Sequence, residues 1–145
     1  MFGKVDHITI IVRDRDKTMK KYEDILRLIP GSRGFVKDFE NDHLAMFTTA
    51  AGARIEIIQV NENDDSPFPK FLAEHGEGVY SYCIYVEDFD TEIKRLKEKG
   101  IKLRETTQYF LFPDHPFRIA WIPAEEGLGV TVELVDVKAI PDFER

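Results

Sequence analysis

The sequence is poor in cysteine, in basic residues and in long apolar runs, and each shortage excludes a class of protein. With a single cysteine, Cys83, the 145-residue chain cannot form an intrachain disulfide. Lys and Arg number 20 against 27 Asp and Glu, and the net charge of −7 gives no support to binding of nucleic-acid phosphates. No apolar run approaches the roughly 20 residues that span a bilayer, and Met1–Lys4 does not open a signal peptide. We therefore expect a soluble, cytoplasmic protein that binds neither nucleic acid nor membrane.

The residues that are plentiful are those of a folded globular domain. Hydrophobic residues make up 43% of the chain, and eleven residues are Phe. A chain of this length can bury enough apolar surface to fold without disulfides or a structural metal. Charged residues of both signs, 32% of the total, provide a solvated surface. The sequence therefore predicts a single domain over residues 1–145.

The chain repeats itself once. Val5–Val12 is matched 74 positions later by Val79–Val86, and both stretches lead into an acidic turn and a charged helical pattern. A second match, at 77 positions, pairs Arg54–Val60 with Thr131–Val137 and places a glutamate at the same point of both stretches. Each half therefore opens on one predicted strand and closes on another.

The order of the predicted elements gives the fold class. Each half contains a strand, a helix and then two or three further strands. We assign module one to residues 1–60, a linker with one helical turn to 61–78, module two to 79–137 and a tail to 138–145. The sequence thus predicts an α+β fold, in which two tandem βαβββ modules form a curved mixed sheet around a concave cavity with the helices outside.

The helix boundaries follow from caps and apolar spacing. Asp14 or Asp16 can cap a first helix, whose apolar residues recur at helical spacing until Pro30–Gly31 stops it. A second helix has an apolar stripe within Phe89–Leu96 and ends at Gly100, a residue that favours helix termination.

The remaining segments are predicted from turn-forming residues and from alternation. Residues 44–49 and 117–122 are predicted strands, and the polar stretch 32–42 is predicted to be a turn-rich connection. A further strand is expected within 108–112. The segment from residue 140 to the end is expected to be peripheral.

Alternation along the strands places four polar side chains on one face. The even positions from 8 to 12 are aliphatic, so His7 lies on the opposite face. Glu56 lies between two isoleucines, and Glu133 has the same place in the second half. Ser81 is the repeat partner of His7. We expect the concave face of the sheet to collect these four side chains.

These residues can also be explained by purely structural roles. A strand histidine can be hydrogen-bonded in the interior, and the two glutamates can pair with Arg54 or Arg118. Two carboxylates on one wall, however, raise each other's proton affinity unless a cation separates them. A metal ion or a bound proton is therefore our interpretation of Glu56 and Glu133.

Four motifs, taken in order and spacing, resemble a known family. They are Asp6–Ile8, Gly76–Gly78, the strand Arg118–Pro123 and the closing Gly129–Leu134. With them the sequence resembles the vicinal oxygen chelate superfamily, which includes glyoxalase I, methylmalonyl-CoA epimerase, extradiol dioxygenases and the fosfomycin and bleomycin resistance proteins. It is most similar to the epimerase and the glyoxalase I-like branch.

The resemblance implies a divalent metal ion (zinc, nickel, cobalt or manganese), held by one residue from the first and last strand of each module. His7, Glu56 and Glu133 match three of the four ligand positions. The remaining position, a histidine in this branch, falls on Ser81, whose neutral hydroxyl is a poor ligand for such an ion. One imidazole and two carboxylates still form a ligand set that water can complete.

The predicted substrate pocket and partners follow. A small molecule is the expected partner, and a homodimer is expected because paired modules leave sheet edges to cover. Arg118 is the candidate to meet an anionic substrate. The pocket is expected to be lined by Ser81, Cys83, Tyr85, Arg118 and Trp121.

The leading functional hypothesis is a metal-dependent lyase or isomerase of the glyoxalase or epimerase type. The metal ion would polarise a carbonyl or thioester oxygen and stabilise an enolate, while a glutamate moves the proton at the adjacent carbon. Glu133 is the first choice for this proton carrier and Glu56 the second. The extra catalytic carboxylate of the epimerase would fall within 44–49, where none occurs, so single-base isomerisation is favoured over two-base racemisation.

Two alternative functions stay open. The missing third ligand at Ser81 favours a binding protein that sequesters a small hydrophobic or anionic molecule without metal chemistry. An extradiol dioxygenase is favoured less, because oxygen activation in such enzymes uses two histidines and one carboxylate. Metal analysis of the purified protein would separate these hypotheses.

Overall fold

The computed structural model divides the chain into two compact units. The described residues are 2–29, 35–38, 42–48, 52–61, 63–108 and 116–140. One unit is His7–Tyr80, and the other combines Met1–Asp6 with Ser81–Arg145. The first strand, β1 (Phe2–Val12), therefore begins in one unit and continues in the other.

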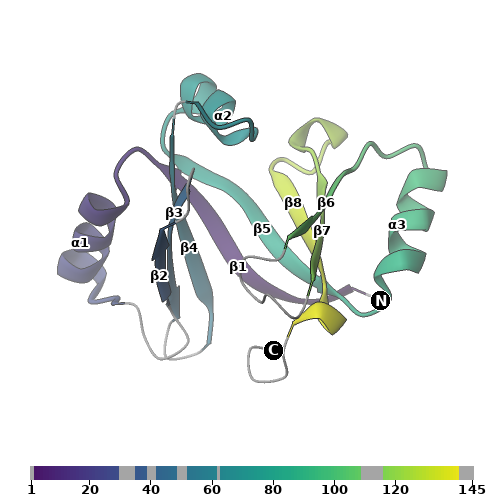
Figure 1. Ribbon diagram of the computed structural model, residues 1–145, viewed down its shortest axis with the longest axis horizontal. Coiled ribbons are helices and arrows are strands. Elements are labelled where there is room, and N and C mark those ends of the chain that lie inside the picture. Colours follow the sequence, from purple (N-terminus) through teal and green to yellow (C-terminus); the bar gives the residue numbers. More distant parts are fainter. Residues whose placement is uncertain are drawn as a thin grey trace. The chain divides into compact units, whose positions relative to one another are not determined.

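The His7–Tyr80 unit contains a mixed sheet and two helices. Its elements after β1 are α1 (Arg15–Leu26), β2 (Phe35–Asp38), β3 (Asp42–Thr48), β4 (Arg54–Val60) and α2 (Phe68–His75). The strand order is β2-β3-β4-β1, in which β1 and β4 are parallel and the other neighbours are antiparallel. Figure 1 shows α1 beside β2, β3 and β4.

The other unit repeats this topology. Its elements are β5 (Gly78–Val86), α3 (Phe89–Glu98), β6 (Arg104–Gln108), β7 (Phe117–Ile122), β8 (Thr131–Asp136) and the short 3-10 helices η1 (Ala124–Glu126) and η2 (Val137–Ala139). The order is β5-β8-β7-β6, with β5 and β8 parallel and the other neighbours antiparallel. In both halves of the chain the described elements follow the predicted strand, helix and three strands, so the α+β class and the βαβββ repeat are confirmed.

Helix α1 begins at the predicted cap but ends before the predicted stop. The Asp14 side chain accepts a hydrogen bond of 2.8 Å from the Lys17 N–H. The helix ends because Arg27 adopts the left-handed conformation, with φ of 56°, and its N–H bonds to the Glu23 carbonyl over 2.9 Å. The predicted stop at Pro30–Gly31 lies outside the described residues.

The two faces of the sheet in the His7–Tyr80 unit are covered differently. Met19 and Tyr22 of α1 pack on one face against the buried Val12, Ala45, Phe47 and Ile57. The apolar side chains of α2 pack on the other face against Ile11, Leu44, Ile58, Val60 and Tyr80. The sequence predicted only one helical turn here, and the structure extends it to the two-turn helix α2.

Helix α3 forms as the sequence predicts. Phe89, Ile93 and Leu96 are buried and pack against the group Val86, Ala120, Ile122, Val132 and Leu134. The chain leaves the helix at Gly100, whose φ of +79° is a conformation that side chains rarely adopt. The predicted apolar stripe and the glycine stop are therefore confirmed.

Three local expectations need correction. Strand β2 lies within the stretch 32–42 that was predicted to be a turn, because its backbone pairs with β3. Strand β6 ends at Gln108, the first residue of the predicted strand 108–112, and residues 109–112 lie outside the described ranges. Ile140 is not peripheral, because its side chain is 4% exposed and packs in a buried apolar group. No helix within the described ranges is long and apolar enough to cross a bilayer.

Candidate active site

The first group of candidate residues lies where β1 runs parallel to β4. Thr9 is in register with Glu56, and alternate strand residues share a face, so His7, Thr9 and Glu56 project to one side. The Thr9 hydroxyl donates a hydrogen bond of 2.9 Å to Glu56 Oε2. His7 Nε2 lies 3.6 Å from the same oxygen. The structure therefore brings the predicted ligands His7 and Glu56 together.

This group is largely shielded from water. The side chains of His7 and Glu56 are 10% and 13% exposed, and Thr9 is buried. An enclosed carboxylate costs free energy unless hydrogen bonds or a positive charge offset the lost hydration. Thr9 supplies one hydrogen bond, and a protonated imidazole or a metal ion can supply the charge.

The second group lies on β8 and its two neighbours. Glu133 is in register with Cys83 of β5 on one side and with Trp121 of β7 on the other. The Cys83 sulfur and a Glu133 carboxylate oxygen lie within 4.8 Å of each other. Glu133 is 9% exposed and Cys83 is fully buried. Glu133 is therefore an enclosed carboxylate beside two predicted pocket residues.

The sequence repeat relates the two groups pair by pair. The 74-position match carries Thr9 onto Cys83, and the 77-position match carries Glu56 onto Glu133. The parallel strands then pair Thr9 with Glu56 and Cys83 with Glu133 in the same register. Each half therefore contributes one glutamate from its last strand, opposite the same position of its first strand.

Two more predicted pocket residues share the Glu133 face. Ser81, Cys83 and Tyr85 are every second residue of β5, so their three side chains project to one side. Ser81 is almost fully buried and in register with Thr131. Tyr85 is buried, with the ammonium of Lys4 placed 5.6 Å from its ring centroid.

Arg118 lies on the opposite face of the same sheet. It is three residues from Trp121 along β7, an odd spacing that reverses the side of the strand. Its guanidinium donates to both carboxylate oxygens of Asp90 and, over 3.4 Å, to Asp136. It also stacks on the ring of Phe89, 4.8 Å from the centroid. The structure therefore does not bring Arg118 together with the other four predicted pocket residues.

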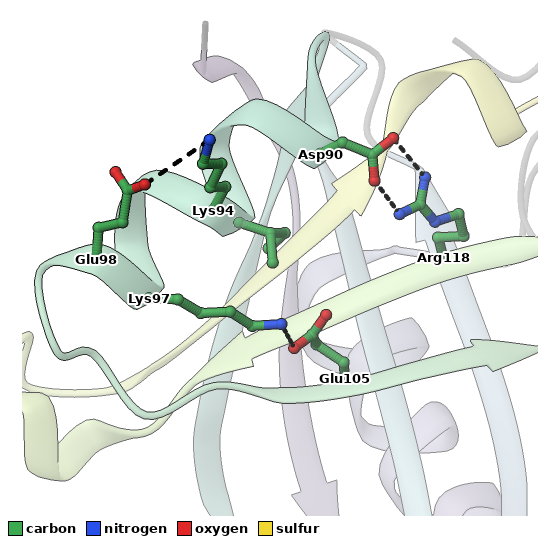
Figure 2. Close-up of a pocket in the computed structure, with 7 residues that line it drawn as sticks. Asp90, Lys94, Lys97, Glu98, Glu105 and Arg118 are labelled. Carbon is green, nitrogen blue, oxygen red and sulfur yellow. Dashed lines mark hydrogen bonds and ion pairs between the residues drawn. The ribbon is translucent and has the colours of Figure 1, made fainter.

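A surface pocket of about 520 Å³ lies beside Arg118, between α3 and the strands β6 and β7. Its charged lining residues form acid–base pairs, as Figure 2 shows: Lys97 with Glu105 at 2.6 Å, Lys94 with Glu98 at 3.9 Å, and Arg118 with Asp90. The hydrogen bonds from Arg118 hold the pKa of Asp90 below its usual value. Because each of these cations already faces a carboxylate, this pocket is a network of ion pairs.

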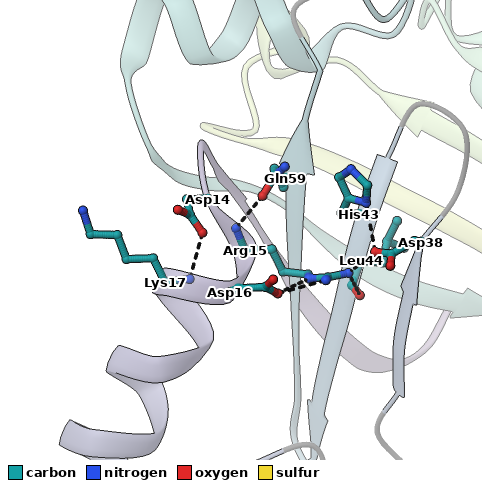
Figure 3. A network of polar contacts seen from close by, with 8 residues as sticks. All are labelled: Asp14, Arg15, Asp16, Lys17, Asp38, His43, Leu44 and Gln59. Atoms are coloured by element: carbon teal, nitrogen blue, oxygen red, sulfur yellow. Dashed lines mark hydrogen bonds and ion pairs between the residues drawn. The ribbon is translucent and has the colours of Figure 1, made fainter.

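A second polar network holds the edge strand β2 to the start of α1 (Figure 3). The buried guanidinium of Arg15 pairs with Asp16 and with Asp38 of β2. His43 Nδ1 lies 2.9 Å from the same Asp38 carboxylate. The contact with His43, followed by that with Arg15, lowers the pKa of Asp38. This network joins a helix to a sheet edge.

Two residues that share a sheet face with a candidate glutamate were not singled out from the sequence. Thr9, which bonds to Glu56, is two positions from His7, so the alternation that selected His7 could have found it. Arg104 is in register with Trp121, and its guanidinium carbon lies 4.9 Å from the centre of the Trp121 ring. No sequence signal marks Arg104, because its strand was not predicted.

The fold and these residues agree with a family match. Residues 6–117 match the model of the Glyoxalase/Bleomycin resistance protein/Dioxygenase superfamily. The match covers more than half of the chain, and the chain belongs to this superfamily. The resemblance seen in the sequence motifs is therefore confirmed.

Within the superfamily, the chain is similar to proteins named as epimerases. It is 28% identical over 106 residues to the ethylmalonyl-CoA/methylmalonyl-CoA epimerase of Cereibacter sphaeroides, covering 71% of this chain and 75% of that protein. It is 25% identical over 133 residues to the mitochondrial methylmalonyl-CoA epimerase of Bos taurus, covering 91% and 73%. The crystal structure of methylmalonyl-CoA epimerase from Mycobacterium tuberculosis superposes with a TM-score of 0.70 at 27% identity, covering 91% and 86%.

Proposed function

We propose that the protein is an epimerase-type isomerase that moves a proton at the carbon next to a thioester or carbonyl group. The observation that carries the proposal is the pair of enclosed glutamates, Glu56 and Glu133, at repeat-related positions of the two halves. The names of the similar proteins support the same reaction class and suggest acyl-CoA thioesters as substrates.

The residues present fit a divalent metal ion. His7 offers an imidazole nitrogen 3.6 Å from a Glu56 oxygen, and Glu133 offers a second enclosed carboxylate. Imidazole and carboxylate are the donor types that zinc, cobalt, nickel and manganese accept. We propose His7, Glu56 and Glu133 as the ligands, with water in the place that Ser81 leaves. When bound, the ion would supply positive charge for the oxygen of an enolate.

Glu133 is our candidate for the residue that carries the proton. Its neighbours on the sheet are a buried thiol and an indole, so a substrate carbon placed against it would meet a carboxylate within an enclosed, largely apolar wall. Glu56 is the second candidate. Its carboxylate is oriented by the hydrogen bond from Thr9, which holds one oxygen in a fixed place.

The strand next to Glu56 offers no further base. Leu44, Met46 and Thr48 of β3 alternate on the face of Glu56, and none of them titrates. Single-base isomerisation is therefore still favoured over an epimerisation that uses a second base on β3. We propose Glu133 as this single base.

The test is exchange of the substrate's α-hydrogen in D2O, with methylmalonyl-CoA and ethylmalonyl-CoA as substrates. Glu133→Gln and Glu56→Gln should each lower the exchange rate by about 100-fold or more, the scale of general acid–base catalysis. Both variants should also retain less metal after dialysis. Glu105→Gln is the matched control, because this surface glutamate pairs with Lys97 on the other face. Normal exchange by the double variant Glu56→Gln/Glu133→Gln would contradict the proposal.

One observation favours a second candidate function. The buried Ser81 stands where the family pattern has a ligand, so the site has one metal-binding side chain fewer. A binding protein of the same fold, which holds a small molecule without turning it over, would need no metal. Calorimetric titration and the hydrogen-exchange assay together distinguish the two functions. The binding protein is supported if metal-free protein binds an acyl-CoA and no hydrogen exchange follows when metal is added.

A further inference from the structure

A row of four side chains crosses the sheet of the second unit through Glu133. Cys83 is in register with Glu133, Glu133 with Trp121, and Trp121 with Arg104. Residues in register on neighbouring strands project to the same face. Arg104 therefore lies on the face of Glu133, the face from which Arg118 is absent.

The guanidinium of Arg104 is held against the indole of Trp121. Its central carbon lies 4.9 Å from the ring centroid, within the range of a cation–π contact. Such stacking orients the planar group but leaves the N–H donors at its edge available for a bidentate contact with a carboxylate or phosphate. The arrangement is a positioned cation, because the aromatic ring fixes a side chain that would otherwise sample many rotamers.

Arg104 differs from its cationic neighbours in lacking an acidic partner. Lys97 pairs with Glu105 and Arg118 with Asp90, both on the α3 side of the sheet. Within the described ranges, no carboxylate oxygen lies within ion-pairing distance of Arg104. Arg104 is exposed and presents its guanidinium on the face of Glu133. It is available to bind an anion from outside the chain.

We propose that Arg104, oriented by Trp121, binds an anionic group of the substrate and determines specificity for it. The inference rests on the proposed function for the place of the reacting carbon, at Glu133. Arg104 and Glu133 are two strands apart, or about 10 Å at the usual strand spacing. The anionic group therefore belongs to a part of the substrate several bonds from that carbon. A phosphate of an acyl-CoA and a distal carboxylate of the acyl chain share the required chemistry.

Two probes distinguish these sources of the anion. Coenzyme A carries phosphates and no acyl carboxylate, and glutarate carries carboxylates and no phosphate. Binding of each can be followed by the fluorescence of Trp121, the single tryptophan of the chain, and by calorimetry. Arg104→Gln should weaken binding of one probe by about 10-fold or more, the scale of a lost charge-assisted contact. Loss with coenzyme A identifies a phosphate, and loss with glutarate identifies a carboxylate.

Two further variants separate the proposed role from a general effect of charge. Arg104→Lys keeps the charge but not the planar fork, and should bind the recognised probe with intermediate affinity. Arg118→Gln removes the same charge from the opposite face and should leave binding unchanged. The inference would be overturned if the wild type and Arg104→Gln bound the probes equally, or if Arg118→Gln lost affinity instead. It would also be overturned if the wild type bound neither probe at millimolar concentration.

The same titrations in a Glu133→Gln background keep this inference separate from the proposed function. Glu133→Gln stops proton transfer but leaves the Arg104–Trp121 pair in place. If the Arg104→Gln loss persists there while the wild type shows no hydrogen exchange, the anion site stands and the isomerase proposal fails. If exchange is normal and Arg104→Gln binds both probes like the wild type, the isomerase proposal stands and the anion site is overturned.

Discussion

The hydroxyl of Thr9 donates a hydrogen bond to Glu56 across the parallel strands β1 and β4, over 2.9 Å. At the repeat-related position of the other half, Glu133 faces the thiol of Cys83. A hydroxyl is a much better donor than a thiol. The two glutamates therefore occupy equivalent places in the topology with different donors beside them, which is a structural basis for giving them different roles.

Removing the Thr9 hydroxyl should destabilise the protein. Thr9→Val keeps the branched shape but leaves an enclosed carboxylate without one of its donors, at a cost of about 1–3 kcal/mol. Unfolding in urea measures this as a lower midpoint. Thr9→Ser keeps the hydroxyl and should retain most of the stability. The role of this hydrogen bond would be refuted by a Thr9→Val midpoint equal to that of the wild type.

The contact between Asp38 and its two cations should make stability depend on acidic pH. The pKa of Asp38 is lowered by His43 and Arg15, so its contribution is present above the pKa of the unfolded chain and is lost as the pH falls through the folded pKa. The urea midpoint of the wild type should therefore exceed that of Asp38→Asn at about pH 5, and the difference should shrink at about pH 3.

The matched control for this pH dependence is His43→Gln. It removes the larger of the two contacts with Asp38 while leaving Arg15 in place. The urea midpoint of His43→Gln should then fall less between about pH 5 and about pH 3 than the midpoint of the wild type does. If the midpoints of the wild type and Asp38→Asn differ by the same amount at both pH values, the contacts of Asp38 with His43 and Arg15 do not stabilise the fold.

Ser81→His should raise the affinity for zinc, nickel or cobalt, because it adds an imidazole at the position where the family pattern has a ligand. A missing direct ligand ordinarily matters more than the about 10- to 100-fold attached to residues behind the ligands. Ser81 is 1% exposed, so the larger side chain should also cost about 1–3 kcal/mol of stability through overpacking. Calorimetric titration measures the metal affinity. If neither the wild type nor Ser81→His takes up metal, the binding-protein alternative becomes the better account.

The protein should form a homodimer, as the sequence leads us to expect from uncovered sheet edges. Exposed apolar side chains at the end of α1, Ile25 and Leu26, are candidates for the contact, at 75% and 56% exposure. Light scattering at high micromolar concentration should give about twice the 16.8 kDa of one chain. A mass of one chain would exclude the dimer. A dimer that is unchanged in Ile25→Lys would exclude this contact.

The parts of the fold that the sequence predicts best are those with a strong repeating pattern. Alternation identified β4 and β7 with their observed bounds, and the apolar stripe and Gly100 identified α3. His7 and Glu56 were expected on one face, and they lie there because strand alternation is set by backbone geometry alone.

The parts that sequence patterns missed depend on tertiary contacts. The edge strand β2 is short and polar, and it forms by pairing with β3 while Asp38 is held by Arg15. Arg118 was expected in the pocket and Arg104 was not, because only the register of β6, β7 and β8 decides which arginine shares the face of Glu133. No local pattern contains that register, since a shift of one residue reverses every side chain.

The parallel pairing of β1 with β4 has a consequence for how the chain folds. Thr9 and Glu56 are 47 positions apart, and α1, β2 and β3 lie between them in the sequence. Closing so long a loop costs entropy that nearby contacts do not repay, so a chain of this topology folds more slowly than a helical bundle of the same size. We expect the hairpin of β3 and β4 to form early and the carboxylate environment at Glu56 to be completed only as β1 docks, which makes the Thr9 contact a marker of the last folding step.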